Sequence, residues 1–449
     1  MNATREEGGG GQAARSAASL KKNAAARFLA EGVMLVVFQA SAIVVARSLG
    51  PTGKGLASLL ALIITVVIMA VDLGLTSAGV YFVGRRKYSA QSVVSTFLAV
   101  GALTGIAAAL ALGGLRYRLA GLIFGGRYDE LILILAIGGP AALLYNWLSG
   151  VLRGQERIVA VSCVNVIGAA AGLSALVLAL YALHLGTASI VWGMNATAVL
   201  GLVACAYLLS RQGIRFNLKL DRALIRDCVG YGLRGQVGQI LQFINYRFDL
   251  LVVNYFLGIA SVGIYGVGAG VAQLIWQIPN SLSFALYSRV SSVSRDEGNA
   301  ITHKVARQSM LLSLLAALLL IPAGYVGVPL LFGESFRPAI VATWLLLPGV
   351  VALSYYKTLG VHMAGQGHPE YYSYGAATSA VVTLTLDFLL VPRIGINGAA
   401  IASSVAYTLS AAICVYWFVR TTGMTNVARL FVPEASDLKT YLHWGSSDG

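Results

Sequence analysis

Charged residues are scarce in this chain. Only 11% of its 449 residues are Asp, Glu, Lys or Arg, whereas 57% are hydrophobic. A water-soluble domain carries charged residues at about a quarter of its positions. So few charges cannot cover a surface that faces water, and the composition therefore excludes an ordinary soluble protein. It predicts a membrane protein that crosses the bilayer many times.

Cysteine and histidine are also few, and their spacing indicates no metal chemistry. The four cysteines, Cys163, Cys205, Cys228 and Cys414, lie in or beside apolar stretches without a CxxC spacing. The five histidines form no HxxxH or HExxH pattern. We therefore expect neither a disulfide framework nor a metal site, and no cofactor.

Long hydrophilic loops are missing as well. The longest outer connection that we expect, residues 114–129, is too short to form a catalytic domain. A membrane glycosyltransferase or polymerase would usually need carboxylates in a large external loop. The sequence therefore favours a protein that is not an enzyme, with a glycan polymerase or transferase as an alternative.

Positive charge exceeds negative charge, with a net charge of +14 at pH 7. The basic residues lie in short connections between apolar runs rather than in a stripe with exposed aromatic residues, so nucleic-acid binding is not expected. Clusters such as Arg85-Arg86-Lys87 and the basic segment 211–227 indicate the cytoplasmic side of the membrane. We expect both termini to be cytoplasmic.

Apolar runs long enough to span a bilayer predict an all-α, polytopic membrane protein. A spanning helix needs about 20 mainly apolar residues. By this rule the spans are 26–48, 55–80, 89–113, 130–152, 158–183, 187–210, 228–257, 260–284, 305–330, 339–364, 373–392 and 396–419.

These twelve spans divide into two sets of six. We predict a disordered cytoplasmic tail (1–24), an N-terminal lobe (25–210), a cytoplasmic linker (211–227), a C-terminal lobe (228–420) and a cytoplasmic C-terminal tail (421–449) with an amphipathic patch at 427–432. Because each lobe has an even number of spans, both enter from the same side, and the repeat is a parallel one.

A repeated hairpin supports duplication of a six-span unit. The first hairpin motif is Leu49-Gly50-Pro51-Thr52-Gly53-Lys54-Gly55, in which Gly50 is followed after four residues by Gly55. The second is Leu257-Gly258, which is again followed after four residues by Gly263. Both motifs join two long apolar runs. Two similar half-bundles that rock about a central site are typical of transporters.

Charged residues inside the predicted spans are the best candidates for function. They are Glu31, Asp72, Arg234, Arg247, Asp249, Lys357 and Asp387. Each costs about 2.5–3.5 kcal/mol at a lipid-facing helix centre on insertion scales. We therefore expect each to face protein or a wet cavity, except Asp387, which lies near the outer end of its span and is expected to reach water.

The seventh span is the richest in polar groups. Gln239, Gln242, Tyr246 and Asp249 share one helix face, as a cavity wall would. Arg247 lies about 15 Å from the outer end of this span. Its guanidinium either pairs with a carboxylate on another span or binds a substrate phosphate. For Asp249 a structural role is the first expectation and ion coupling the second.

Four further charges lie toward the predicted inner ends of their spans. Arg234 and Lys357 either extend to the inner headgroups or attract an anionic headgroup that enters from the cytoplasm. Glu31 and Asp72 either pair with a basic neighbour or carry a coupling proton or sodium ion. The residues alone leave these alternatives open.

The order of several short motifs resembles a known family. They are Ala46 to Pro51 followed by Gly55, Val71-Asp72-Leu73-Gly74-Leu75, Asp249, Leu257-Gly258, Gly263-Ile264-Tyr265, and Gly395 to Ala400. Together they are similar to the bacterial polysaccharide-biosynthesis flippases, the Wzx-type branch of the MOP exporter superfamily. The resemblance covers nearly all of residues 25–420.

The resemblance implies a MATE-like, V-shaped pair of six-helix lobes that works by alternating access. It implies a flippase that moves undecaprenyl-pyrophosphate-linked oligosaccharide from the inner to the outer leaflet of the bacterial cytoplasmic membrane. On this hypothesis Arg247 binds pyrophosphate, Arg234 and Lys357 attract it, and Gln239, Gln242 and Tyr246 bind sugar hydroxyls. Membrane lipids, a polysaccharide polymerase, a chain-length regulator and H⁺ or Na⁺ are the implied partners.

Two other members of that superfamily remain as alternatives. Flippases of the peptidoglycan lipid precursor have fourteen helices and a basic/acidic pair early in the first span, whereas twelve spans are predicted here and the first holds only Glu31. MATE-type, cation-coupled drug antiporters often have a deep carboxylate in the first span, whereas Glu31 lies near the inner end. Both departures make these alternatives weaker.

Overall fold

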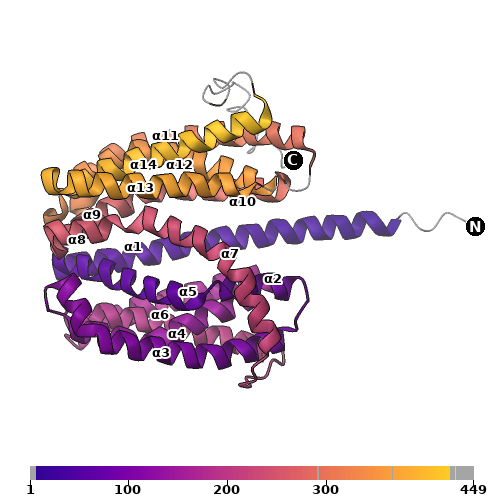
Figure 1. Ribbon diagram of the computed structural model, residues 1–449, viewed down its shortest axis with the longest axis horizontal. Coiled ribbons are helices and arrows are strands. Elements are labelled where there is room, and N and C mark those ends of the chain that lie inside the picture. Colours follow the sequence, from indigo (N-terminus) through magenta and orange to yellow (C-terminus); the bar gives the residue numbers. More distant parts are fainter. Residues whose placement is uncertain (1–6, 291–292, 367, 425–429, 431–449) are drawn as a thin grey trace, which may run out of the picture. The chain divides into compact units, whose positions relative to one another are not determined.

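The computed structural model describes residues 7–290, 293–366, 368–424 and 430, and every regular element in this part of the chain is helical (Figure 1). Ten of the described helices are long and apolar enough to cross a membrane. The prediction of an all-α, polytopic membrane protein is confirmed.

Two further crossings bring the number to about twelve. The apolar part of α1 (Glu7–Asp72) is 44 residues long, Leu29–Asp72, which is about 66 Å of helix and enough for two crossings of a hydrocarbon core about 30 Å thick. Its backbone is non-helical at Gly50, where the two crossings meet. α7 (Arg222–Arg247) and α8 (Asp249–Leu257) together form the second additional crossing. It is not among the ten apolar helices because its charged residues lower its mean hydropathy.

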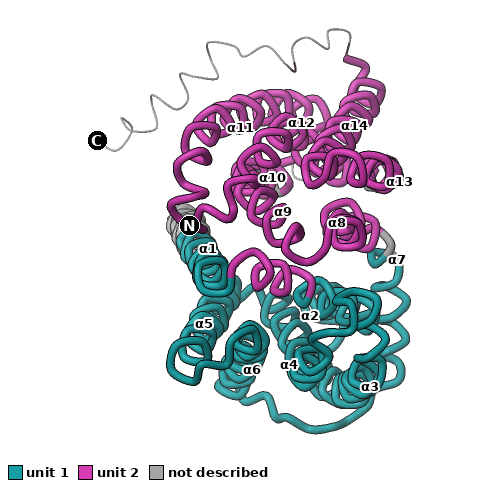
Figure 2. The backbone as a smooth tube through the Cα atoms, turned by 90° about the vertical axis from the view of Figure 1, so that its left-hand side faces the viewer, with its two compact units in different colours: residues 1–49, 60–237 teal, residues 50–59, 238–449 magenta. Residues whose placement is uncertain are grey.

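The chain divides into two compact units that differ from the predicted lobes (Figure 2). Unit 1 comprises Met1–Leu49 and Leu60–Val237, and unit 2 comprises Gly50–Leu59 and Gly238–Gly449. The first hairpin, in the N-terminal half of the sequence, therefore belongs to unit 2. The first part of α7, which we assigned to the linker and the C-terminal lobe, belongs to unit 1.

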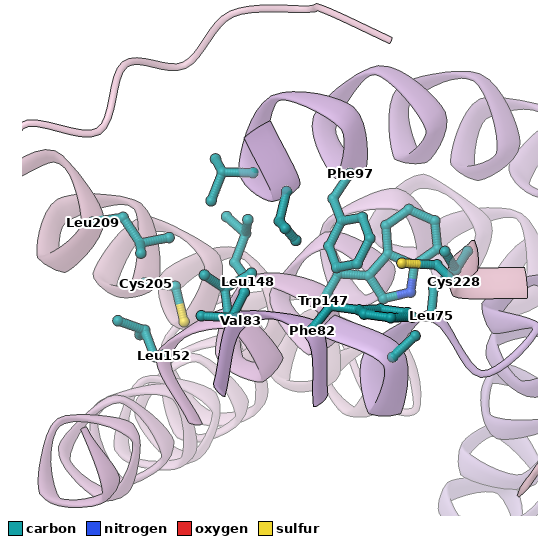
Figure 3. Packing of buried hydrophobic residues seen from close by; sticks show 14 of the residues in the cluster. Leu75, Phe82, Val83, Phe97, Trp147, Leu148, Leu152, Cys205, Leu209 and Cys228 are labelled. Carbon is teal, nitrogen blue, oxygen red and sulfur yellow. The ribbon is translucent and has the colours of Figure 1, made fainter. Parts of the chain in front are cut away.

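Unit 1 is a bundle around a core of large side chains. Its remaining elements are α2 (Leu75–Gly84), α3 (Ala90–Phe124), α4 (Asp129–Gly154), α5 (Ile158–Val177), η1 (Leu178–Ala182) and α6 (Ala188–Ser210). α4 packs against α2, α3 and α6, and α5 packs against α6. Phe97 and Trp147 meet at the centre with ring centroids 5.3 Å apart (Figure 3). Leu224 and Cys228 of α7 join this core.

Helix ends in unit 1 follow local sequence signals. Ser89 caps α3 by accepting a hydrogen bond from the Ser92 amide at 3.1 Å. Leu73 and Gly74 have positive φ and interrupt the span that we predicted over 55–80. α3 continues to Phe124, so most of the predicted outer loop 114–129 is helix instead. Its apolar residues after Gly114 extend the helix beyond the thickness of the bilayer.

Unit 2 is built around α12. Its elements are α8, α9 (Ile259–Ala272), η2 (Gln273–Trp276), α10 (Gln277–Val290), α11 (Arg295–Phe332), η3 (Glu334–Phe336), α12 (Ala339–Gly365), α13 (Pro369–Ile394) and α14 (Ile396–Thr422). α12 packs against α9, α10, α11, α13 and α14. The residues that line α12 therefore face neighbours on nearly every side.

The repeated hairpins adopt the same backbone and pack against each other within unit 2. Gly50 (φ 64°, ψ −166°) and Gly258 (φ 81°, ψ 175°) both lie in a region of positive φ and extended ψ that is essentially restricted to glycine. A Cβ atom on Gly55 would collide with the Ile259 carbonyl, and a Cβ on Gly263 would collide with the Pro51 carbonyl. In each hairpin, the second glycine therefore meets the residue that directly follows the first glycine of the other hairpin.

The termini differ from the expectation in one respect. α1 begins at Glu7, so helical backbone runs through part of the segment 1–24 that we expected to be disordered, where five alanines favour a helix. The C-terminal tail lies almost entirely outside the described residues. Leu430 is described and buried, and its carbonyl accepts a hydrogen bond from Tyr355 at 2.7 Å.

Candidate functional site

Three of the predicted site residues meet in unit 2, around the amine of Lys357. This residue lies on α12, and its Nζ donates a hydrogen bond to Oδ1 of Asn280 at 2.9 Å. The same Nζ lies 4.8 Å from the ring centroid of Trp276 and 5.9 Å from that of Tyr246. A cation over aromatic faces is held by cation–π attraction, which is stronger where water is excluded.

More aromatic side chains extend this cluster. Tyr246 packs on Trp276 with centroids 4.9 Å apart. Nε2 of Gln242 donates to the Tyr372 hydroxyl at 3.0 Å, and Tyr372 stacks on Tyr356 at 4.4 Å. We call Gln242, Tyr246, Trp276, Asn280, Lys357 and Tyr372 the lysine–aromatic cluster.

Proline shapes the part of the cluster that comes from α10. η2 is a short 3₁₀ helix that ends at Trp276, and α10 begins at the next residue. Pro279, in the first turn of α10, has no N–H to donate to the preceding turn, so the helix is interrupted there. Trp276 and Asn280 are then four residues apart and share a face that reaches Lys357.

Two polar atoms in this cluster are buried without a hydrogen-bond partner among the described residues. They are the Tyr246 hydroxyl and the Trp276 indole Nε1. Leaving such a group unsatisfied costs about 1–3 kcal/mol. A polar ligand or water that reaches them would recover this free energy, so the cluster is suited to a ligand that carries oxygen atoms.

The other predicted cavity residues lie apart from this cluster. Gln239 and Arg247 are exposed on α7, and within the described residues Arg247 has no hydrogen-bond or ion-pair partner. Arg234 lies on α7, but its side chain is outside the part of the chain that the structure describes. The structure thus brings Gln242, Tyr246 and Lys357 together and leaves Arg247 outside this cluster, exposed on the same unit.

A second polar site surrounds Asp249. This residue is only 4% exposed, and its carboxylate accepts hydrogen bonds from the Tyr265 hydroxyl at 2.5 Å and from the Leu250 amide at 2.8 Å. The Tyr265 hydroxyl also lies 3.5 Å from the hydroxyl of Ser403. Asp249 is thus held on α8 by neutral donors.

Asp387 is a correction to the sequence-based expectation. We expected it to reach water, but its side chain is 0% exposed on α13, and neither carboxylate oxygen has a hydrogen-bond partner in the described chain. α13 packs against α8, the helix that begins at Asp249. The position of Asp387 along its span indicated how deep it lies in the membrane. It did not indicate that the side chain faces the interior of the helix bundle. The carboxyls of Asp249 and Asp387 form what we call the acidic pair.

The two acidic candidates of unit 1 have different surroundings. Asp72 is buried, and its Oδ1 accepts hydrogen bonds from the indole of Trp147 and from the hydroxyl of Thr76, each at 2.6 Å. Neutral donors, rather than a basic neighbour, satisfy it there. Glu31 is exposed on α1.

Comparison with known families now decides the assignment. Residues 44–341, most of the chain, match the family described as polysaccharide biosynthesis protein. The chain belongs to this family. A search of the curated proteins found no match.

The chain shares its fold with solved membrane proteins, two of which are transporters of the MOP superfamily. A multidrug resistance MATE family transporter in an inward-facing conformation has a TM-score of 0.75 at 17% identity, with 91% of this chain and 98% of that chain covered. The lipid II flippase MurJ, in an inward closed conformation, has a TM-score of 0.78 at 12% identity, with coverages of 94% and 93%.

A MOP superfamily transporter from Pyrococcus furiosus has a TM-score of 0.63 at 16% identity and covers 91% of this chain and 95% of its own. Identities this low show the fold alone. The family match confirms the resemblance to polysaccharide-biosynthesis proteins, and the fold of this multi-pass membrane protein is the one that these solved structures have.

Proposed function

We propose that this polysaccharide biosynthesis protein flips an undecaprenyl-pyrophosphate-linked oligosaccharide from the inner to the outer leaflet of the bacterial cytoplasmic membrane. Both termini lie in the cytoplasm in this proposal. The two halves alternate in exposing the cargo, the polyprenyl tail stays in lipid, and a polysaccharide polymerase and a chain-length regulator use the product.

The lysine–aromatic cluster is the observation that carries this proposal. It combines a half-buried ammonium, aromatic faces and two unsatisfied donors inside a membrane-spanning unit. A pyrophosphate sugar offers the matching groups, because phosphate oxygens accept from Lys and sugar rings pack on aromatic faces while their hydroxyls bind polar atoms. Gln242 and Tyr246 take the sugar in this scheme.

The remaining predicted residues have supporting roles. The exposed guanidinium of Arg247 binds pyrophosphate in the bidentate manner that arginine favours, and Arg234 attracts it at the inner mouth. Gln239 extends the sugar-binding face of α7. The acidic pair carries the coupling proton or sodium ion, since a buried, unpartnered carboxyl such as Asp387 is most stable when it is neutral or bound to a cation. Asp72 and Glu31 have structural roles.

Complementation tests the binding role. In a strain that lacks the gene, the wild-type chain should restore lipid-linked glycan in the outer leaflet. Lys357→Ala and Arg247→Ala should each reduce flipping about tenfold or more, since a hydrogen bond to a charged group contributes about 1.5–3 kcal/mol. Lys357→Arg should retain part of the activity.

Arg127→Ala is the matched control, because Arg127 is exposed on a connection in unit 1 outside the cluster. All variants must insert and express at wild-type levels. Normal flipping by both Lys357→Ala and Arg247→Ala would refute the proposed site.

The acidic pair also fits a second candidate, a cation-coupled drug antiporter of the MATE type. Such a protein would lower the cellular accumulation of a cationic dye, and Asp387→Asn would abolish this efflux. A flippase would leave dye accumulation unchanged while its deletion strain lost outer-leaflet glycan. Rescue of cells that lack their peptidoglycan-precursor flippase would instead favour that activity.

A further inference from the structure

A segment without regular secondary structure joins α6 to α7 in unit 1 and is held against α3 by side chains. Gln91 accepts a hydrogen bond from the Arg215 amide at 2.7 Å and donates one to the Arg215 carbonyl. The Thr96 hydroxyl lies 3.3 Å from both the Lys219 carbonyl and the Asp221 amide. These bonds hold the backbone of Arg215 and of Lys219 to Asp221 against α3, and the Asn217 amide donates back to the Arg215 carbonyl at 3.2 Å.

This segment alternates apolar and polar residues, with a set of large apolar side chains exposed. Phe216, Leu218 and Leu220 are 43%, 74% and 50% exposed. Arg215 and Lys219, which alternate with these apolar residues in the sequence, are exposed as well. Three adjacent exposed apolar side chains on a connecting segment mark an interaction surface rather than a solvated loop.

The charge around the segment is positive and is not neutralised locally. The basic residues are Arg211, Arg215, Lys219, Arg222 and Arg226, and none of them forms an ion pair with a described residue. The two acidic residues are already engaged. Asp221 accepts from the Ala223 and Leu224 amides at 3.0 and 3.1 Å, and Asp227 pairs with Lys87 at 2.6 Å.

The segment lies where membrane-spanning helices end. α6, a candidate span, ends at Ser210, and α3, another candidate span, begins at Ala90, next to the residue that clamps Arg215. We infer that residues 214–220 form an interfacial anchor for anionic phospholipid. Phe216, Leu218 and Leu220 enter the boundary between headgroups and acyl chains, and Arg215 and Lys219 bind the phosphates above them.

Spin-label depth measurements test the apolar side of this anchor. Cys163 is the exposed cysteine among the four, so a Cys163→Ser background leaves only buried thiols. Nitroxides placed one at a time at Phe216, Leu218 and Leu220 should be relaxed more by oxygen, which concentrates in lipid, than by a water-soluble nickel chelate. The measurement uses the full chain reconstituted in nanodiscs.

Lipid binding tests the basic side. Native mass spectrometry of the detergent-solubilised full chain should show retained phosphatidylglycerol in preference to phosphatidylcholine. Each of Arg215→Gln and Lys219→Gln should weaken phosphatidylglycerol retention by about fivefold, because one basic residue near an anionic surface contributes about 1 kcal/mol. The exposed Arg127→Gln, elsewhere in unit 1, is the control and should change nothing.

Nickel access equal to or above oxygen access at all three apolar positions would overturn the anchor. Equal retention of both lipids, or no effect of the two substitutions, would overturn its preference for anionic headgroups. Capture of a soluble protein with loss of oxygen access would identify a protein partner and also refute the lipid assignment. Flipping activity enters none of these readouts.

Discussion

At the scale of single residues, Asp72 shows how hydrogen bonds stabilise a carboxylate that is buried inside a membrane-spanning helix bundle. It accepts two side-chain hydrogen bonds at 2.6 Å, from Thr76 and Trp147, and a third from the Thr76 amide at 3.2 Å. A buried charge is destabilising unless several donors satisfy it. Short bonds to a charged acceptor are about twice as strong as neutral ones. The network therefore fixes α1, α2 and α4 together.

Thr76→Val tests this network with little change in shape. It removes the hydroxyl donor and keeps the Thr76 amide, so the free energy of unfolding should fall by about 1.5–3 kcal/mol. Chemical denaturation in mixed micelles measures it. Thr104→Val is the control, because the Thr104 hydroxyl bonds only to a carbonyl of its own helix, and its effect should stay within about 0.5 kcal/mol. Equal effects would contradict the role of Asp72.

A surface pair near the start of α7 gives a pH-dependent prediction. Hydrogen bonds from Lys87 and then Tyr88 lower the pKa of Asp227, and the bond to Asp227 raises the pKa of Lys87. For Asp227, stabilisation is present above the unfolded pKa of about 3.9 and is lost as the pH falls through the lower folded value. The melting-temperature difference between wild type and Lys87→Met should therefore be constant near neutral pH and shrink below pH about 4. In an Asp227→Asn background, Lys87→Met should have no such pH-dependent effect.

Sequence reasoning selected individual candidate residues but did not predict which side chains the structure places beside them. Lys357 and Tyr246 were predicted as site residues, whereas Trp276 and Asn280 were missed. An Asn and a Trp four residues apart in an apolar helix were a signal that an inspection of charged residues alone overlooks. Asp387 was misjudged because hydropathy reports the depth of a residue, while its exposure depends on which helix packs over it.

At the scale of elements, glycine at the hairpins decides how closely two backbones approach. Gly55 and Gly263 each face a carbonyl oxygen of the other hairpin. The motif spacing predicted the two hairpins and their similarity. It did not predict that they contact each other, because that contact depends on how α9 packs against residues 50–59.

Gly263→Ala and Gly270→Ala form a matched pair on α9. The first places a methyl group against the Pro51 carbonyl, so the free energy of unfolding should fall by about 1–3 kcal/mol. The second meets nothing within 4 Å and should raise it by about 0.5–1 kcal/mol, the helix-propensity gain over glycine. Denaturation in micelles compares them. Similar effects of both changes would show that the hairpin contact is loose.

Hydropathy alone does not predict where each membrane-spanning helix begins and ends. The apolar runs predicted the number and order of crossings, since each crossing must contain about 20 apolar residues. They did not predict the break at Leu73 and Gly74, which depends on positive φ. A Cβ on Gly74 would collide with the backbone of Gly232, so the break is also the point where α7 approaches α1.

At the scale of the whole molecule, the chain passes between the two units in three places. It crosses after Leu49, after Leu59 and after Val237. The first crossing coincides with Gly50 and its positive φ. The third lies inside α7, in a stretch that contains Gly230, Gly232, Gly235 and Gly238. Any change in the arrangement of the units must be absorbed by the backbone at these places.

Gly238→Ala and Gly230→Ala distinguish an effect of helix stiffness, at the third place where the chain passes between the units, from an effect on overall stability. A Cβ at either position meets nothing within 4 Å, so both changes should raise the free energy of unfolding by about 0.5–1 kcal/mol. Gly230 lies within the part of α7 that belongs to unit 1, whereas Gly238 is the first residue of unit 2. If flipping requires bending at this crossing, Gly238→Ala should slow it in the outer-leaflet glycan assay while Gly230→Ala leaves it unchanged. Equal flipping rates in the two variants would exclude bending of α7 at Gly238 as part of the transport cycle.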